Sequence, residues 1–362
     1  MLSLFKKKED INEINITQSG ISIIIPVHNE EEIIEKKIED TINVSNDITE
    51  REIIIVDDAS NDNTSKICKN YSEQYPFIKL KTFDCRGGKT RSINYGTAIS
   101  THEFILYTDA NIFLKGSDLL KTLSLFTDEK VGCICGEKRP IQMVISGTGK
   151  GVGFYARWEW FVKSLESKID SVVGADGGLF MIRKRLFTAL PEDVIDDFTT
   201  SLNIRIKGYK IILSTYLLGM EPATTNYKEE FISKVRVISR AWKGFLYSYR
   251  VLYFWKYPVF TWEFISHKIL RWLSPFFMLC LLLIVPVSFN NIYFMPFSLL
   301  YIIFLILSFL GYLSEKNKRR NRFLSVPFYF CLVNFAAING LARFLMGKSN
   351  VIWQKSQSSR KF

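Results

Sequence analysis

Short apolar runs separated by amphipathic stretches make up the chain from residue 21 to about residue 214. The runs have the length and composition of buried strands, at residues 21–25, 52–56, 104–108, 131–136, 179–182 and 210–214. Helical periodicity follows the first two runs, and polar residues stand where these strands end. Successive strand–helix units of this kind predict an α/β domain with a mostly parallel sheet of the nucleotide-binding type. A glycine-rich stretch at residues 146–153 predicts a loop before an aromatic helix at Phe154–Ser167.

The pattern changes after residue 230. Phe231 to Arg250 alternates basic with apolar residues and predicts an amphipathic helix, either on a membrane surface or lending arginine to a phosphate. Tyr253 to Trp262 is dense in aromatic residues, as at a bilayer interface. Ile269–Phe289 and Ile292–Leu313 have the length of membrane spans, and the very short turn between them predicts a transmembrane hairpin.

The last apolar stretch, Pro327–Met346, is interrupted by Asn334, Asn339 and Arg343. Polar groups in hydrocarbon are costly, so we expect a shallow interfacial helix, with a third crossing as the alternative. The interfacial placement keeps the tail from Trp353 to Arg360 in the cytoplasm. The expected domains are a polar leader (1–20), a catalytic domain (21–230), amphipathic or interfacial helices (231–266), two transmembrane helices (267–313) and a basic C-terminal part (314–362).

Charge is distributed unevenly along the 362 residues. The formal net charge is +11, and from Val251 onward 13 Lys and Arg face only two Asp and Glu, so the earlier part is neutral. A neutral globular part argues against nucleic acid as a partner. A cationic, aromatic C-terminal part favours the cytoplasmic face of an anionic membrane. Because the first ten residues lack an apolar signal segment, we expect the catalytic domain to stay in the cytoplasm. Together with the expected spans, this predicts a multi-pass protein of the inner (cytoplasmic) membrane.

Cysteines do not indicate a metal centre. Of the six, only Cys133 and Cys135 are close in sequence, and no second ligand pair accompanies them. We therefore expect reduced thiols, mostly buried, rather than zinc ligands or disulfides.

Candidate chemistry gathers where the strand at 104–108 ends in Asp109-Ala110-Asn111. If the chain stays extended, the side chains of Asp109 and Asn111 point the same way and can share a hard divalent cation, which would neutralise a diphosphate. An Asx turn closing a strand explains the same residues without function.

Two further motifs each have two interpretations. Gly87-Gly88-Lys89-Thr90 lacks the upstream glycine of a P-loop, so Lys89 either reaches a phosphate or belongs to a solvated basic turn. Asp196-Asp197 either begins a helix, where carboxylates favour the dipole, or supplies a base that activates a hydroxyl.

Taken in order, these motifs resemble the family 2 glycosyltransferases of GT-A fold. The similarity covers about residues 20–250 and points to the membrane-attached branch that contains cellulose and hyaluronan synthases. The series comprises Pro26-Val27-His28-Asn29-Glu30, Asp57-Asp58, Gly88-Lys89 with Asn94, Asp109-Ala110-Asn111, Gly174 to Gly178 with Arg183, Asp196-Asp197, Arg236 and Arg240.

The resemblance implies a role for each site residue. Nucleotide-sugar contacts are expected from Pro26, His28, Asn29, Glu30, Asp57, Asp58, Lys89 and Asp109. Asp109 and Asn111 would hold Mn²⁺ or Mg²⁺ on the diphosphate. Asp197 would be the general base, with Asp196 beside it. The acceptor is expected to lie against Gly177, Gly178, Arg236, Arg240 and Trp242.

The implied function is inverting transfer from a nucleotide-diphosphate sugar, with UDP expected, to a glycan or lipid-linked acceptor in cell-surface polysaccharide biosynthesis. Membrane lipids and the proteins of an assembly complex are the further partners implied. Asn111 replaces the second acid of D-x-D, Asp196-Asp197-Phe198 replaces T-E-D, and no Q-x-x-R-W is present. These departures favour addition of one or few sugars. The alternatives are a processive synthase, a polyprenyl-phosphate glycosyltransferase and an inactive membrane scaffold.

Overall fold

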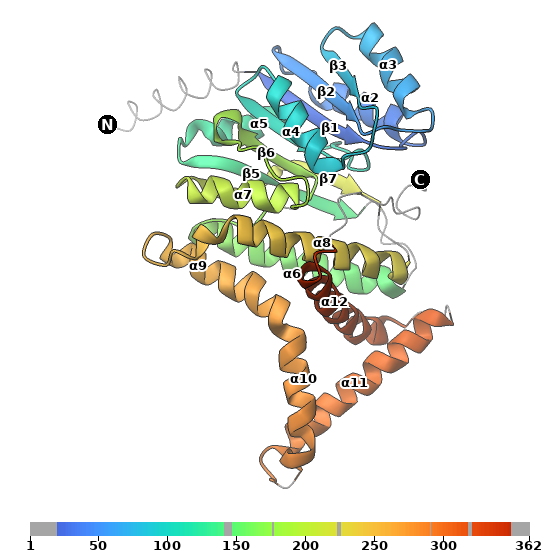
Figure 1. The fold of residues 1–362 in the computed structure, drawn as a ribbon, viewed down its shortest axis with the longest axis vertical. Coiled ribbons are helices and arrows are strands. Elements are labelled where there is room, and N and C mark those ends of the chain that lie inside the picture. The colour runs from blue at the N-terminus through green and yellow to red at the C-terminus, as the bar shows by residue number, and fades with distance from the viewer. Residues whose placement is uncertain are drawn as a thin grey trace.

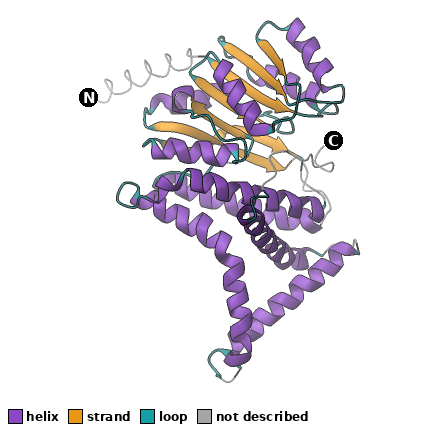
Figure 2. Cartoon of the chain, viewed as in Figure 1, coloured by secondary structure: helices purple, strands orange, loops and turns teal. Residues whose placement is uncertain are grey.

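A seven-stranded sheet forms the centre of the first part of the molecule (Figures 1 and 2). The computed structural model describes residues 20–140, 147–175, 177–222, 226–289, 291–317 and 321–348. Nearly all of the expected leader, and the tail from residue 349, lie outside this part. The strands are β1 (Ile21–Val27), β2 (Arg51–Asp57), β3 (Ile78–Thr82), β4 (Phe104–Thr108), β5 (Val131–Pro140), β6 (Leu179–Arg183) and β7 (Lys210–Glu221).

The sheet is mostly parallel, as the sequence predicts. Its order is β3-β2-β1-β4-β6-β5-β7, and within it only β6 pairs antiparallel, with β4 and with β5. The helices of this part are α2 (Ile34–Val44), α3 (Thr64–Gln74), α4 (Lys89–Ile99), α5 (Leu119–Ser124), α6 (Gly147–Ile169) and α7 (Asp196–Ile206). The fold is therefore the α/β type expected.

Both faces of the sheet are buried, which explains why the strands read as continuous apolar runs. Alternate side chains of a strand point to opposite faces. In β1, Ile23 and Ile25 belong to one core cluster and Ile24 to the other; in β2, Ile53 and Ile54 divide in the same way. Helices cover both faces, and such doubly covered parallel strands need no polar side.

The second part of the molecule is helical. It contains α8 (Tyr227–Tyr247), α9 (Pro258–Phe264), α10 (Leu270–Ser288), α11 (Met295–Lys316) and α12 (Arg322–Leu345). A π-helical turn at Ile265–Ile269 joins α9 to α10. Figure 1 shows α6 and α8 lying together between the sheet and the last three helices. A third core cluster, which includes Phe198, Phe245, Phe264 and Trp272, joins α7, α8, α9 and α10.

Within the described residues, three helical segments are long and apolar enough to cross a membrane: Pro258–Ser288, Met295–Lys316 and Phe323–Leu345. In an apolar 18-residue window of each of the first two, only 17% is buried within the protein, against 50% in the third. The first two expose rows of Leu, Ile and Phe that suit a hydrocarbon solvent. Helices α10 and α11 meet where Ser288 contacts Ser298 and then diverge, so the expected hairpin is an open V (Figure 1).

Three local features differ from the sequence-based expectations. Strand β3 and helix α5 were not expected, because β3 (Ile-Lys-Leu-Lys-Thr) is an edge strand with two lysines and α5 has only six residues. Residues 147–153, expected to form a loop, begin α6. The cysteines in the described residues are unpaired in the structure, and four of them are buried.

Candidate active site

A cavity of about 280 Å³ opens at the carboxyl ends of β1 and β4. The amino ends of α4 and α7 and one side of α8 complete its walls. Its lining residues are Pro26, Val27, His28, Asp58, Lys89, Ser92, Asp109, Ala110, Lys138, Gly177, Ile195, Asp196, Asp197, Lys234, Arg236, Val237 and Arg240. Open α/β sheets bind ligands at this edge, so we call it the donor cavity.

The two acids that the sequence singles out meet here, on either side of a glycine pair. A methyl group placed on Gly178 would lie 2.4 Å from Cγ of Asp109, and one placed on Gly177 would lie 2.7 Å from Oδ2 of Asp197. Backbone N–H of Asp109 also donates to the Gly178 carbonyl over 3.0 Å. A side chain at either position would displace a carboxylate of the site, and Gly178 also has a left-handed φ of +81°, which favours glycine.

Lys89 links the acids electrostatically. Its Nζ lies 2.8 Å from Oδ1 of Asp109 and 3.2 Å from Oδ2 of Asp196. Burial opposes the charge of this lysine, but Asp109, Asp196 and Asp197 outweigh burial and raise its pKa. Lys89 is thus a permanent cation at the centre of the cavity. Of its two sequence interpretations, the structure excludes the solvated turn, because the side chain is only 18% exposed.

Asp197 has the properties of a base. It stands in the first turn of α7, is only 5% exposed, and its Oδ1 accepts the backbone N–H of Phe198. Burial and the neighbouring charge of Asp196 raise the pKa of Asp197 to about 6, although Lys89 acts in the opposite direction. A carboxyl group with a pKa in this range is ionised at neutral pH and accepts a proton more readily than an ordinary aspartate.

Helix α8 closes the cavity with cations. Arg236 and Arg240 both line it; burial and the charge of Arg240 lower the pKa of Arg236 to about 10. The Arg240 guanidinium donates to Thr90 Oγ1 (2.8 Å), to the Glu192 carbonyl (3.1 Å) and to the Val194 carbonyl. Arg240 therefore fixes α8 against the segment before α7. Trp242, expected at the acceptor, lies outside the cavity lining and packs on Trp272, 4.8 Å between ring centroids.

Besides Lys89 and Asp109, the sequence predicts six residues that contact the nucleotide sugar. Three of these six line the cavity: Pro26, His28 and Asp58. The His28 ring donates from Nδ1 to the Asp58 carbonyl over 2.8 Å. The Asp58 carboxylate accepts the backbone N–H groups of Gly87 (2.7 Å) and Gly88 (2.8 Å), so it holds the loop that begins α4.

The other three residues of that set hold turns outside the cavity lining. Asp57 accepts from the backbone N–H of Ser60 and from the hydroxyls of Ser60 and Ser65. Asn29 has a left-handed φ of 53° and accepts the N–H of Asn61 through its side-chain oxygen. Glu30 is fully buried, and its backbone N–H donates to Thr64 Oγ1.

Asn111 is not among the residues that line the donor cavity, although Asp109 is. The chain turns after β4, as the bond from Ile112 N–H to the Asp109 carbonyl shows, so the alternation of an extended chain does not apply. The Asn111 amide donates instead to Glu221 of β7 (3.1 Å). The alternation of an extended chain therefore cannot pair Asp109 with Asn111, and Asn111 as a metal ligand stays a prediction.

A divalent cation nevertheless fits the donor cavity. Across the described ranges of the chain, no three His, Cys, Asp or Glu side chains are grouped to hold a metal by themselves. Mg²⁺ and its relatives are usually held by one or two carboxylates together with substrate phosphates. Asp109 lines the cavity and offers one such carboxylate. Asp196 is close by, because Lys89 forms ion pairs with both acids.

Two lysines were missed by sequence reasoning. Lys138 of β5 lines the cavity and donates to the Gly177 carbonyl (2.9 Å). Lys37 of α2 is fully buried and donates to Thr108 Oγ1 (2.9 Å) and to the Ile112 carbonyl, one on each side of Asp109. A lysine on the buried face of an amphipathic helix was the available signal for Lys37.

Comparison with known proteins agrees with this architecture. Residues 22–190 match the profile of "Glycosyl transferase family 2". The chain is 31% identical over 209 residues to "Probable glycosyltransferase YdaM" of Bacillus subtilis (strain 168), covering 53% of this chain and 48% of that protein. It is 25% identical over 211 residues to "Poly-beta-1,6-N-acetyl-D-glucosamine synthase" of Staphylococcus aureus (strain COL), covering 57% and 50%. The chain thus spans about half the length of these relatives.

A solved structure extends the similarity to the whole fold. "Mannosyltransferase PcManGT from Pyrobaculum calidifontis in complex with GDP-Man and Mn2+" superposes with a TM-score of 0.63 at 20% identity, covering 91% of this chain and 87% of that one. At this identity the likeness concerns the fold alone. The profile match shows a glycosyltransferase family 2 domain at residues 22–190. The superposition shows the GT-A fold, and apolar helices long enough to cross a membrane follow this domain.

Proposed function

We propose that the protein is a membrane-bound inverting glycosyltransferase that transfers a sugar from a nucleotide-diphosphate sugar, with UDP-sugars expected, to a glycan or lipid-linked acceptor. The single observation that carries the proposal is the convergence of Asp109 and Asp197 on one cavity, on either side of Gly177 and Gly178. These acids are 88 positions apart in the sequence, and Lys89 lies between their two segments.

Each side chain has a role that follows from its position. Lys89 and Arg236 supply fixed positive charge for the diphosphate leaving group. A divalent cation held by Asp109 would, when bound, neutralise part of the same charge. Asp197 accepts the proton of the acceptor hydroxyl as that oxygen attacks the anomeric carbon. Attack from the side opposite the leaving group inverts the anomeric centre.

Donor recognition is tested first. The purified full chain is screened with a panel of UDP- and GDP-sugars with Mn²⁺ or Mg²⁺, and a true donor raises the melting temperature by mass action. Asp109→Ala is expected to lose the metal-dependent part of this stabilisation. Asp197→Asn is expected to keep it, because Asp197 acts on the acceptor.

Transfer is tested next, with the donor that the screen identifies. Asp197→Asn is expected to lower kcat by about 100-fold or more, the contribution of a positioned general base. Asp193→Asn is the matched control: Asp193 is a neighbouring acid outside the cavity lining, 40% exposed and paired with Lys243 at 2.6 Å. An inactive scaffold would bind no donor and would respond to neither substitution, and that result would refute the proposed function.

A further inference from the structure

A second cavity, of about 200 Å³, adjoins the donor cavity. The two share Gly177, Ile195, Asp197, Lys234 and Val237, so the proposed base faces both. From Asp197 the second cavity continues away from the sheet, to the first turn of α10 and to α12. We call it the membrane-side cavity, because α10 begins there and leads into the exposed apolar helices (Figure 1).

One side of the membrane-side cavity is strongly cationic. Lys163, Lys268 and Arg271 line it together with Lys234, and the only carboxylates among its lining residues are Glu159 and Asp197. Lys163 is 2% exposed and Lys268 is 9% exposed. Burial would raise the pKa of Glu159, but Lys268, Arg271, His267 and Lys163 outweigh burial and hold that pKa well below its ordinary value. On this side of the cavity Glu159 is the lining carboxylate beside Lys163, Lys268 and Arg271, and Glu166 pairs with His267 outside the lining.

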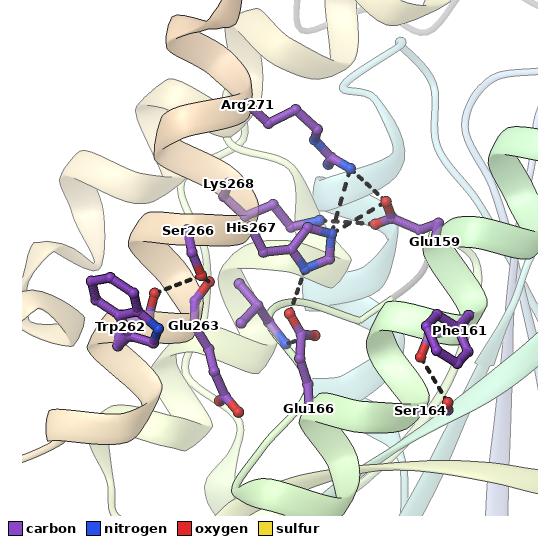
Figure 3. A network of polar contacts seen from close by, with 11 residues as sticks. Glu159, Phe161, Ser164, Glu166, Trp262, Glu263, Ser266, His267, Lys268 and Arg271 are labelled. Carbon is purple, nitrogen blue, oxygen red and sulfur yellow. Dashed lines mark hydrogen bonds and ion pairs between the residues drawn. The ribbon is translucent and has the colours of Figure 1, made fainter. Parts of the chain in front are cut away.

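These cations are held in place by a network that joins α6 to the start of α10 (Figure 3). Glu159 accepts from Lys268 (3.2 Å) and from Arg271, and His267 lies between Glu159 and Glu166. Glu166 in turn accepts the backbone N–H of Val173 over 3.0 Å. The positive charge is therefore built into the fold rather than carried on flexible surface side chains.

The other side of the membrane-side cavity is apolar. It consists of Ile238, Ala241, Trp272, Val333 and Ala337, from α8, α10 and α12. Trp272 belongs to the first candidate span, and Ala337 to the third. A ligand in this cavity would contact cations on one side and helices suited to hydrocarbon on the other.

We infer that the membrane-side cavity binds the acceptor, and that this acceptor is a lipid carrying a phosphate or diphosphate group. The anion would lie against Lys163, Lys268 and Arg271, and the hydrocarbon chain would leave along Trp272 and α12. Arginine with lysine is the usual phosphate-binding set, and the cavity places Lys163, Lys268 and Arg271 opposite an apolar wall. A hydroxyl of the same molecule would then face Asp197. The inference rests on the proposed function and specifies its acceptor.

The first experiment measures binding and needs no donor. The full chain in nanodiscs is titrated with farnesyl-diphosphate-linked N-acetylglucosamine, farnesyl N-acetylglucosaminide without phosphate, and N-acetylglucosamine 1-phosphate without lipid. We expect the first probe to bind at least tenfold more tightly than either of the others. Lys163→Met should remove most of this advantage, because it deletes a buried cation while Glu159 keeps Lys268 and Arg271 as partners. Lys168→Met, an exposed lysine of the same helix, should leave it unchanged.

If the farnesyl probes with and without diphosphate bind equally, the cavity does not recognise the phosphate. If the lipid-free phosphate binds as tightly as the diphosphate lipid, the cavity does not recognise the lipid. Either result would overturn the inference. If Lys163→Met leaves binding unchanged, the anion does not bind at Lys163 and the inference is refuted.

The second experiment measures transfer with the same probes: Lys163→Met should raise KM for the diphosphate lipid and not for the phosphate-free lipid. Equal increases for both would refute the inference. Failure of the wild type to bind any nucleotide sugar would count against the proposed function instead, and the binding experiment would still decide the inference.

Discussion

Gly177 and Gly178 determine how closely the two carboxylates of the site can approach the backbone. Gly178 has a φ of +81°, and an added methyl group would meet Asp109 at 2.4 Å. We therefore expect Gly178→Ala to displace Asp109 and to lower transfer by about 100-fold, since misplacement by about 1 Å has this effect on catalysis. Thermal unfolding and kcat/KM, measured on the same preparation, check the prediction.

The matched control is Gly208→Ala, because Gly208 has a φ of +93° but nothing within 4 Å of the added methyl group. Both variants pay the backbone strain of a left-handed alanine, about 1–2 kcal/mol. Only Gly178→Ala should lose activity beyond what this destabilisation explains. Equal activity in the two variants would show that Gly178 serves only the turn.

The raised pKa of Asp197 predicts the acid side of the pH profile. The base must be ionised to accept a proton, so kcat/KM should fall about tenfold per pH unit below pH 6 and level off above it. Asp196→Asn removes a neighbouring negative charge that raises the pKa of Asp197, so this variant should move the acid limb to lower pH. A limb that stays in place, or moves to higher pH, would assign the titration to another group.

At the scale of elements, α2 supports the turn that carries Asp109. Lys37 is fully buried, and burial lowers its pKa to about 8, although Asp40 and Asp109 act in the opposite direction. Lys37→Met should leave the Ile112 carbonyl without this donor, destabilise the fold by about 1–3 kcal/mol, and loosen Asp109. Because Asp109 is proposed to contact the donor through a divalent cation, we expect KM for the nucleotide sugar to rise more than kcat falls.

The control for α2 is Lys36→Met, which removes an exposed lysine one position away on the same helix. Steady-state kinetics and chemical denaturation of both variants separate the two effects. If Lys37→Met lowers stability while KM for the donor stays at the wild-type value, Lys37 supports the fold and not the position of Asp109.

Elements whose pattern depends on local sequence were predictable, and long-range partners were not. Buried strands such as β1 and β4 are visible because the sheet is covered on both faces. Strand β3 lacks this signal, because it lies at the edge of the sheet and two of its five residues are lysines. The 23-residue helix α6 begins with a glycine-rich stretch, which by its local sequence predicts a loop. Whether such a stretch becomes helical depends on tertiary packing, which can override local propensity.

The same distinction applies to the site. The acids at Asp109 and Asp197 stand at the ends of recognisable elements, so their convergence follows from the topology of a parallel sheet. The direction of Asn111 depends on Glu221, which lies 110 positions away, and that of Lys37 on a carbonyl 75 positions away. Nothing in the local sequence specifies such pairs. The alternation expected of an extended chain does not apply to Asp109 and Asn111, because a turn replaces the extended chain there.

At the scale of the whole molecule, α12 determines how many times the chain crosses the membrane. It runs beside α8 along most of its length: Tyr329 bonds Glu230 near one end, and Phe344 stacks on Trp242 near the other. A methyl group on Gly340 would touch Ile238 at 2.9 Å, so the two helices are in close contact between these points. Helix α8 also lines the donor cavity, so α12 packs against the same part of the molecule as the site. From this packing we predict that α12 lies at the membrane interface and does not cross.

This placement predicts a two-span topology. Helices of 19 and 22 residues, α10 and α11, are about 28–33 Å long, which matches a hydrocarbon core of about 30 Å. Single cysteines are introduced as Asn291→Cys in the turn between them, Asn317→Cys after α11 and Lys348→Cys after α12, with the exposed Cys85 and Cys280 replaced by serine. Intact cells are then treated with a membrane-impermeant maleimide. We expect labelling of position 291 in intact cells, and of positions 317 and 348 only after permeabilisation. Labelling of 348 without 317 in intact cells would show that α12 crosses the membrane, and would require α8 and the donor cavity to separate from it.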